Sequence, residues 1–327
     1  MNILIVCSGV IPAKMYGGTE RVIWYLGKEL SKMGHKVTFL VARGSCCDFA
    51  SVIYLDSQKT LSEQIPLSTD IVHFHIQPSE PILKPYVITI HGNCNDFREF
   101  DTNSIFVSKN HATRFGSDSF VHNGLDWEDY GRPNLSRKRN YFHFLGKAAW
   151  SVKSAKGAID IIKFTEKEQL NVLGGYRLNL KMGFRFTLSP RVHFKGMVGG
   201  TEKNMLLGGS KGLIFPVRWH EPFGLALTES LYFGCPVFGT PYGSLPEIIT
   251  PEVGFLSDSS VEIIKEIENI DNYSRVLCHE YAVDVFNSKK MAESYIEKYL
   301  KVLNGEQLNP VSPKLVEKQM VKLLDWK

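Results

Sequence analysis

Two glutamates and a central glycine stand close together in the segment PVRWHEPFGLALTESLYFGCPVFG, residues 216–239. Apolar runs and the glycines Gly224 and Gly234 predict a strand, a loop, a helix and a second strand. On one continuous helix Glu221 and Glu229 would lie about 80° apart and would not share a face. We therefore expect Glu221 in the loop before the helix and Glu229 on the helix, with both carboxylates facing one ligand.

The start of this predicted helix has the chemistry of an anion site. The backbone amides of Gly224, Leu225 and Ala226 have no partner within a helix, and the helix dipole favours negative charge at that end. A glycine also lets a phosphate approach the backbone closely. A carboxylate accepts hydrogen bonds from neighbouring hydroxyls, such as those of a ribose or a pyranose. The structural alternative is that Glu221 caps the helix and Glu229 is solvated.

Two lysines follow the strand predicted at residues 141–145. Lys147 comes directly after Gly146, and Lys153 lies near the start of the next predicted helix. Fixed cations stabilise negative charge on a bound anion such as a phosphate, most strongly where water is excluded. Lys156 is the alternative to Lys153 as the second cation. The structural alternative is that all of them are ordinary surface lysines.

Two further features stand at strand or helix ends in the first half of the chain. His91 closes the apolar run YVITIH and precedes a glycine, so its side chain is expected at the edge of a sheet. The alternative is a histidine that only completes local hydrogen bonds. Gly17 and Gly18 precede a predicted helix, where they could bind an anion or let an acceptor approach the backbone, or form a plain turn. For His73 and His75 we expect packing in preference to a metal site.

The elements that position these residues alternate along the chain. Residues 2–42 predict a strand, a helix and a second strand, which is the building block of a parallel sheet. Further strand-like runs follow, including one at 119–122, and the polar stretch 130–140 predicts a linker. Open α/β sheets bind ligands at the carboxyl ends of their strands, so the site is expected in a cleft between two domains. The prediction is α/β domains at 1–138 and 139–287, an amphipathic helix at 288–304 and a loosely docked tail at 305–327.

Composition agrees with two soluble α/β domains and excludes several other classes. The 327 residues are 43% apolar and 22% charged, which excludes a disordered or collagenous chain. A net charge of +4 is too small for a nucleic-acid binder. Six cysteines without C-x-x-C spacing indicate reduced thiols in a cytoplasm. The sequence contains no run of about 18 apolar residues, so we predict no membrane span. The chain has no Asp-x-Asp triplet, and we predict no metal.

Taken together, these segments resemble the retaining glycosyltransferases of family 4. That family has the GT-B fold, in which two Rossmann-like domains face each other across a cleft. HEPFGLALTESLYFGCPVFGT resembles its signature, and the resemblance extends over about residues 2–257. The other segments that carry it are the glycine pair at 17–18, TIHG, HNGLD, FLGKAAWSVKSAKG, GSLPEII and VGFL.

The resemblance implies a role for each site residue. Glu221 would hold the hydroxyls of the transferred sugar, Glu229 the ribose of the nucleotide, and the glycine-led turn between them the diphosphate. His91 would lie beside the sugar and the acceptor. Lys147 stands where relatives commonly have arginine, and a lysine offers a point charge without the bidentate fork of an arginine. The helix at 288–304 would cross back to the first domain.

The expected function is a metal-independent transfer of a sugar, with retention of configuration, from a UDP- or GDP-linked donor to an acceptor hydroxyl. The expected partners are this donor and a saccharide or lipid-linked acceptor of surface polysaccharide or lipopolysaccharide synthesis. No resident cofactor and no nucleic acid are expected. The basic cluster at 137–139 and the lysine-rich tail fit a cytoplasmic enzyme at the periphery of an anionic membrane. The alternative is that these charges belong to ordinary solvated faces. The alternatives are a sugar-nucleotide epimerase of similar architecture and a non-catalytic nucleotide-sugar-binding protein.

Overall fold

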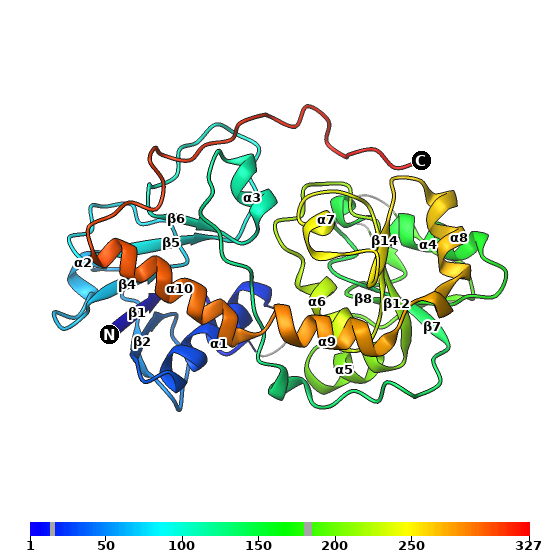
Figure 1. The fold of residues 1–327 in the computed structure, drawn as a ribbon, viewed down its shortest axis with the longest axis horizontal. Coiled ribbons are helices and arrows are strands. Elements are labelled where there is room, and N and C mark those ends of the chain that lie inside the picture. The colour runs from blue at the N-terminus through cyan, green and yellow to red at the C-terminus, as the bar shows by residue number, and fades with distance from the viewer. Residues whose placement is uncertain (14–16, 180–184) are drawn as a thin grey trace. The chain divides into compact units, whose positions relative to one another are not determined.

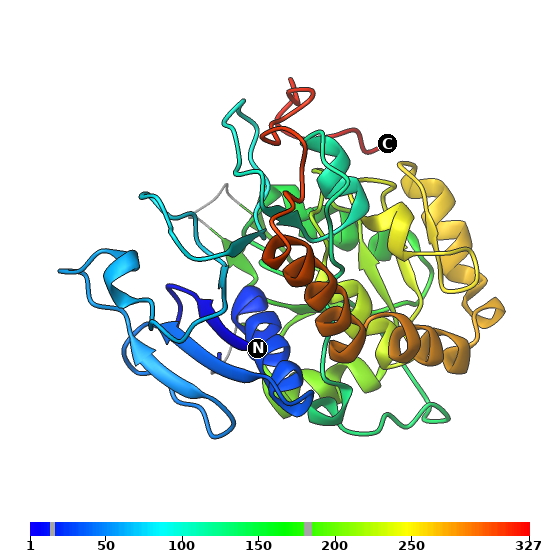
Figure 2. The same cartoon turned by 60° about the vertical axis from the view of Figure 1, so that its left-hand side comes forward.

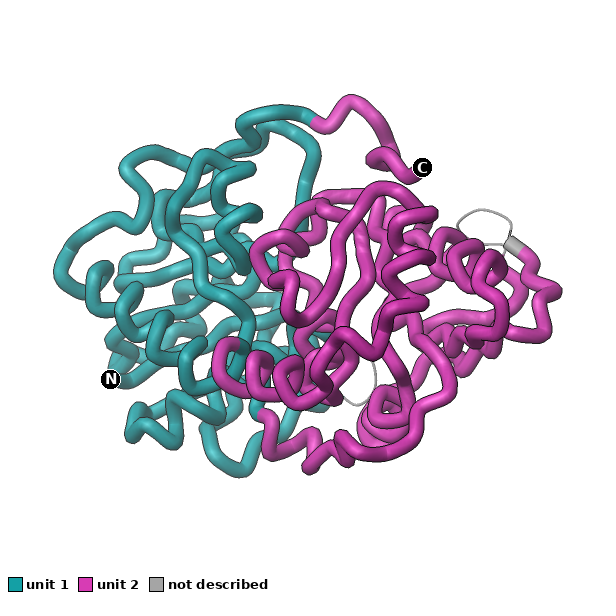
Figure 3. The backbone as a smooth tube through the Cα atoms, turned by 45° about the vertical axis from the view of Figure 1, so that its right-hand side comes forward, with its two compact units in different colours: residues 1–126, 286–318 teal, residues 127–285, 319–327 magenta. Residues whose placement is uncertain are grey.

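The chain folds into two compact units. The computed structural model describes residues 1–13, 17–179 and 185–327. Unit 1 contains residues 1–126 and 286–318, and unit 2 contains residues 127–285 and 319–327 (Figure 3). The chain therefore passes between the units at 126, at 285 and at 318.

The first boundary differs from the one expected at residue 138. Trp127 stacks on Tyr232 of unit 2 with the ring centroids 4.4 Å apart. The Tyr232 hydroxyl also donates to the carbonyl oxygen of Gly131 at 2.6 Å. The polar stretch after Asp126 therefore packs with unit 2, because aromatic contacts distant in sequence hold it there.

Unit 1 contains a parallel sheet in the strand order β3-β2-β1-β4-β5-β6 (Figure 1). Each strand pairs in parallel with its neighbours. The run expected as a strand at 119–122 makes only a single bridge between Phe120 and Phe106. The strands are β1 (Asn2–Val6), β2 (Lys36–Val41), β3 (Ser51–Tyr54), β4 (Ile71–Phe74), β5 (Tyr86–Ile90) and β6 (Ser104–Phe106). The helices are α1 (Gly18–Lys32), α2 (Leu61–Gln64), α3 (Lys109–Arg114) and α10 (Ser288–Leu303).

Unit 2 contains a second parallel sheet in the order β11-β8-β7-β12-β13-β14, together with a short antiparallel pair of β9 and β10. Its strands are β7 (Tyr141–Leu145), β8 (Leu170–Leu173), β9 (Leu178–Asn179), β10 (Arg185–Phe186), β11 (Val192–Phe194), β12 (Ser210–Phe215), β13 (Val237–Gly239) and β14 (Gly254–Leu256). Its helices are α4 (Ala155–Phe164), α5 (Gly200–Gly208), α6 (Leu225–Tyr232), α7 (Leu245–Ile248), α8 (Ser260–Glu268) and α9 (Arg275–Val285). Short 3-10 turns form at Trp127–Tyr130, Ser151–Lys153 and Ile270–Asn272.

The two sheets have the same topology. When the strands of each sheet are counted in chain order, their spatial order is 3-2-1-4-5-6, the order of a doubly wound Rossmann-like domain. The winding direction reverses between β1 and β4 in unit 1 and between β7 and β12 in unit 2. Ligands of such sheets bind at the carboxyl ends of the strands at this point. The predicted class, two Rossmann-like α/β domains, is confirmed.

The long C-terminal helix α10 belongs to unit 1. It lies beside α1 (Figure 1, Figure 2). The apolar stripe expected from the sequence is buried, and Tyr295 and Tyr299 have no exposed surface. The Tyr299 hydroxyl is 2.7 Å from Nδ1 of His73, and the Tyr295 hydroxyl is 3.0 Å from Oγ1 of Thr89. The helix therefore packs against strands β4 and β5 through both apolar area and hydrogen bonds.

The segment after Gly305 is docked rather than loose. In unit 1, buried Asn309 donates from Nδ2 to the carbonyl oxygen of Ser104 at 2.9 Å. In unit 2, the amide of Leu324 donates to the carbonyl oxygen of Arg218 at 2.9 Å, and the Arg218 side chain donates back to Leu324 at 2.7 Å. Among the described helices, none combines the length and the apolar character needed to cross a membrane.

Candidate functional site

The parallel sheet of unit 2 brings two separately predicted motifs together. Strands β7 and β12 are neighbours, so the loops that follow them leave the same edge of the sheet side by side. The loop after β7 carries Lys147 and Lys153, and the loop after β12 carries Glu221. The amide of Arg218 donates to the carbonyl oxygen of Val152 at 2.7 Å and ties the two loops to each other. This edge is the switch point at which an open α/β sheet binds its ligand.

Lys153 and Glu221 contact each other directly at this point. The Nζ atom of Lys153 lies 2.5 Å from Oε2 of Glu221, and Nε1 of Trp219 donates to the same oxygen at 2.7 Å. The ammonium also lies 5.0 Å from the ring centre of Trp219 and 5.4 Å from that of Phe215. Within the described residues, Oε1 of Glu221 has no hydrogen-bond partner. One carboxylate oxygen is therefore held in place while the other can accept hydrogen bonds from a ligand.

Glu229 is held on α6 by a second lysine. Its Oε1 atom contacts Nζ of Lys203 from α5 and accepts a hydrogen bond of 2.7 Å from the Tyr130 hydroxyl. Glu229 is 2% exposed, so the solvated alternative is excluded. Sequence reasoning did not find Lys203 or Tyr130, because both are distant in sequence from Glu229. Lys203 and Tyr130 come together at Glu229 only because α5 packs beside the turn at Trp127–Tyr130.

Replacing Lys203 with methionine is expected to lower the free energy of unfolding by about 3–5 kcal/mol, because the buried Glu229 carboxylate loses the ammonium that contacts it. The double variant K203M/E229Q is expected to recover most of this loss, since a neutral amide still accepts a hydrogen bond from Tyr130. Urea denaturation measures both. The matched control is Lys156→Met in an exposed ion pair, which should change stability very little. A loss below about 1 kcal/mol for K203M would contradict the importance of the pair.

The helix start predicted near Gly224 is present in the structure. Gly224 is the N-cap of α6 with φ +84°, a left-handed conformation that favours glycine, and no side chain caps the helix. The alternative in which Glu221 caps this helix is therefore excluded. Gly243 packs against the same loop, because a Cβ atom there would lie 2.2 Å from the amide nitrogen of Glu221. The amide of Ser244 donates to the Glu221 carbonyl oxygen at 2.9 Å. The turn after β13 thus holds the loop that carries Glu221 in place.

The other predicted residues of this edge differ in their surroundings. Lys147 is exposed, with Nζ 5.0 Å from the ring centre of Trp150 and no ion pair to a carboxylate in the part of the chain described. Gly146 has a φ of +156°. A Cβ atom on Gly174 would lie 2.1 Å from the carbonyl oxygen of Gly146, so the backbones of these two glycines are in close contact. Lys156 lies on α4 and pairs with Asp160 at 2.5 Å. The structure therefore places Lys153, and not Lys156, next to Glu221.

In unit 1, His91 follows β5 at the carboxyl edge of the sheet, as predicted. Its Nε2 atom lies 2.8 Å from Nδ1 of His75, which follows β4. Both rings line a cavity of about 360 Å³. Burial lowers the pKa of His91 to about 4, and burial together with the neighbouring rings of His73 and His91 holds the pKa of His75 well below its usual value. Both rings are therefore neutral at pH 7.

The glycine pair predicted for the acceptor side begins α1. Gly17 is the N-cap, with an extended backbone at φ −178°, and no side-chain hydrogen bond caps this helix either. Thr19 in the first turn lines the same cavity as His91. Residues 14–16, the rest of the turn predicted before Gly17, lie outside the described residues. The glycines and His91 thus belong to one edge of the sheet of unit 1.

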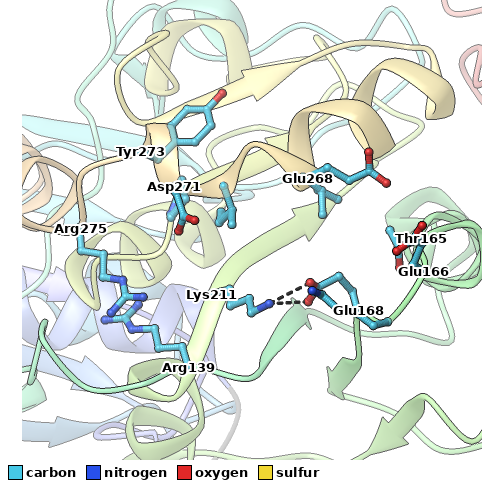
Figure 4. A pocket seen from close by; sticks show the side chains of 13 residues that line it. Arg139, Thr165, Glu166, Glu168, Lys211, Glu268, Asp271, Tyr273 and Arg275 are labelled. Atoms are coloured by element: carbon cyan, nitrogen blue, oxygen red, sulfur yellow. Dashed lines mark hydrogen bonds and ion pairs between the residues drawn. The ribbon is translucent and has the colours of Figure 1, made fainter.

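Unit 2 also has a cavity of about 690 Å³ (Figure 4). It lies at the edge of the sheet opposite to the edge that carries Lys153 and Glu221. Arg139 precedes β7 and Lys211 stands near the start of β12, so this cavity adjoins the amino ends of the strands. Lys211 pairs with Glu168 at 2.7 Å. Arg139 is 5% exposed and donates to carbonyl oxygens at the end of α6, so it cannot join a membrane-facing basic cluster. The cavity lacks the strand-end chemistry of a Rossmann-like site.

In the segments that the structure describes, no group of three or more histidine, cysteine, aspartate or glutamate side chains is placed to hold a metal ion. The residues gathered at the two carboxyl edges instead offer lysine ammoniums, uncapped helix amides, carboxylate oxygens and a neutral histidine. These groups suit the binding of phosphate and of sugar hydroxyls.

Comparison with known proteins agrees with this chemistry. Residues 132–282 match the family model for glycosyl transferases group 1. An uncharacterized 41.2 kDa protein in the cps region of Klebsiella pneumoniae is 30% identical over 147 residues, which are 43% of this chain and 39% of that protein. The match thus spans well under half of the curated relative. The family match lies within unit 2 and covers just under half of the chain.

Two solved structures share the fold over nearly the whole chain. AviGT4, a glycosyltransferase involved in avilamycin A biosynthesis, has a TM-score of 0.76 and 20% identity, covering 93% of this chain and 98% of that one. Anabaena Alr3699/HepE in complex with UDP-glucose has a TM-score of 0.66 and 16% identity, covering 92% and 100%. At these identities the likeness establishes the two-domain GT-B fold.

Proposed function

We propose that this protein is a retaining, metal-independent glycosyltransferase that moves a sugar from a UDP- or GDP-linked donor to an acceptor hydroxyl. The observation that carries the proposal is the contact between Lys153 and Glu221 at the switch point of unit 2, where Oε1 of Glu221 has no hydrogen-bond partner within the described residues. The group 1 family match over the same unit supports it. The binding of UDP-glucose by HepE supports a nucleotide sugar as the donor.

Unit 2 would hold the donor through its loops and helix ends. The diphosphate would take hydrogen bonds from the uncapped amides at the start of α6 and charge from Lys153 and Lys147. Gly146 has no side chain, so phosphate oxygens could approach its backbone closely. Glu221 would accept hydrogen bonds from the sugar through Oε1. Glu229, fixed by Lys203, would face the ribose.

The transfer would break the bond between the anomeric carbon and the β-phosphate oxygen and form one to the acceptor oxygen on the same face. The proton of the acceptor hydroxyl would pass to an oxygen of the departing phosphate. The protein would supply orientation of the two substrates and fixed positive charge near the leaving group. His91 would position groups around the sugar.

The acceptor we propose is a saccharide or a lipid-linked saccharide of surface polysaccharide synthesis. The curated relative in a cps region supports this class. An enzyme that acts on a lipid-linked acceptor would work in the cytoplasm at the inner membrane face. Of the basic cluster expected there, only Arg137 and Lys138 are exposed to contribute, because Arg139 is buried.

Thermal unfolding in the presence of UDP-, GDP- and ADP-sugars tests the proposal. A donor that binds the folded state raises its stability by about 2.7 kcal/mol at a concentration 100 times Kd, so one nucleotide series should raise Tm clearly. The donor found in this way is then incubated with and without candidate acceptors. Absence of any shift contradicts the proposal. Conversion of the donor sugar without an acceptor supports an epimerase instead, and tight binding with no turnover supports a binding protein.

A further inference from the structure

His75 and His91 form a pair of imidazole rings joined by one hydrogen bond. They follow the neighbouring strands β4 and β5, with Nδ1 of His75 2.8 Å from Nε2 of His91 and the ring centroids 5.0 Å apart. At this separation exactly one of the two nitrogens must carry a proton, since two lone pairs would repel and two protons would clash. The question is which ring donates.

The surroundings of His75 decide the direction. Its Nε2 atom is buried and has no hydrogen-bond partner within the described residues. If His91 donated, the single proton of neutral His75 would sit on Nε2 as a buried N–H without an acceptor, which native structures rarely tolerate. If His75 donates, only an acceptor lone pair is left without a partner.

The geometry points to a fixed tautomer: we infer that His75 carries its proton on Nδ1, donates it to Nε2 of His91, and thereby keeps the proton of His91 on Nδ1. His75 is thus a positioning residue that acts through His91. The neighbouring His73 cannot take over this task, because its two ring nitrogens are engaged by the Tyr299 hydroxyl and by Oγ1 of Thr89, both at 2.7 Å.

The charge state of the pair agrees with this direction. Burial lowers the pKa of both rings, so neither is an imidazolium at pH 7. The ring of His73 lies 4.1 Å from that of His75 and is itself neutral, since burial lowers its pKa to about 3. With two neutral rings, each carries a single proton, and the position of one proton fixes the other.

The consequence for the ligand follows from the second nitrogen of His91. Its Nδ1 atom has no protein hydrogen-bond partner among the described residues, and His91 lines the 360 Å³ cavity. An N–H at this atom is a donor, so His91 would bind an acceptor oxygen, such as a sugar hydroxyl or a phosphate oxygen. It would not serve as a base at this nitrogen. This consequence rests on the proposed function, whereas the tautomer does not.

Long-range ¹H–¹⁵N correlation spectra of the ¹⁵N-histidine-labelled full chain at pH 7 test the inference directly. We expect protonated-type nitrogen shifts for Nδ1 of His91 and Nδ1 of His75, and unprotonated-type shifts for both Nε2 atoms. The His91 signals are assigned as those missing from a His91→Gln variant. A proton on Nε2 of His91, an imidazolium, or an exchanging mixture of tautomers would each overturn the inference.

A variant series then separates positioning from simple packing. His75→Phe keeps a ring but removes the donor, so His91 should show both tautomers and kcat for sugar transfer should fall about tenfold, the value of one hydrogen bond. The matched control is His193→Phe on β11 of unit 2, which should change neither the tautomer of His91 nor kcat. Unchanged His91 shifts in His75→Phe contradict the inference. If no nucleotide sugar binds at all, the proposed function fails while the spectra of the wild-type chain still decide the tautomer.

Discussion

Replacing Glu221 with glutamine is expected to lower the rate of sugar transfer by about 100- to 1,000-fold, the usual cost of removing one preorganised polar group from a reaction centre. Glutamine matches the shape of glutamate and still accepts a hydrogen bond from Trp219. It loses the negative charge that orients Lys153 and the strong acceptor at Oε1. Steady-state transfer assays with the donor identified by thermal unfolding measure the effect.

Lys153, which forms an ion pair with Glu221, can be compared with the nearby Lys156. Lys153→Met should lower kcat to a similar degree, because the departing diphosphate loses a fixed cation, while Lys156→Met should remain within about twofold of the wild type. Lys156 is a fair control, since it lies three residues away and pairs with Asp160 on the surface of α4. Equal losses for the two lysine variants would contradict the assignment of Lys153. Glu221→Gln activity within about threefold of wild type would contradict the role of Glu221.

Double replacement separates stability from catalysis. In Glu221→Gln the Lys153 ammonium loses its negatively charged partner and keeps a neutral amide oxygen and its aromatic neighbours, so this variant is expected to be less stable than wild type. The double variant E221Q/K153M removes both charges and should regain stability without regaining activity. Recovery of transfer in the double variant would show that the single variants fail through misfolding.

Much of the fold could be predicted from the sequence because the strands are buried on both faces. Strand β7 at Tyr141–Leu145, strand β8 at Leu170–Leu173 and helix α10 begin and end where the apolar runs indicate. Strand-end residues such as Lys147, Glu221 and His91 could also be placed, since parallel strands present their carboxyl ends at one edge. These inferences depend only on local pattern and on a general rule of topology.

The rest depends on contacts that no local pattern records. Whether Lys153 or Lys156 meets Glu221 is decided at Ser154, whose φ of +54° separates the 3-10 turn at Ser151–Lys153 from α4. A left-handed serine is uncommon and carries no sequence signal of its own. Similarly, the pairing of Lys203 with Glu229 requires two helices to be packed first.

Lowering the pH from 7 to 5 is expected to remove at least about 6 kcal/mol of stability from the chain, because its buried histidines bind protons only when the chain unfolds. Burial lowers the pKa of His73, His111 and His143 to about 3 in the folded state, against about 6.5 in the unfolded state. Between these values the unfolded chain binds more protons, so stability is complete above about pH 6.5 and is lost as the pH falls. Each histidine contributes about 2 kcal/mol at pH 5.

The two units should respond unequally, which makes the expectation sharper. His73, His75, His91 and His111 lie in unit 1 and His143 in unit 2, so unit 1 should lose more stability than unit 2 at pH 5. Urea denaturation at pH 7, 6 and 5, followed by circular dichroism and tryptophan fluorescence, measures this.

His143 offers a substitution that isolates one of these three contributions. Its two nitrogens lie 2.7 Å and 2.8 Å from the hydroxyls of Ser210 and Ser230, so glutamine keeps some of this bonding but binds no proton. His143→Gln should therefore reduce the loss of stability between pH 7 and pH 5 by about 2 kcal/mol, even where its stability at pH 7 is lower. A stability that does not change between pH 7 and 5 would mean that these rings are protonated in the folded chain, and the neutral histidine pair at the edge of unit 1 would then lose its basis too.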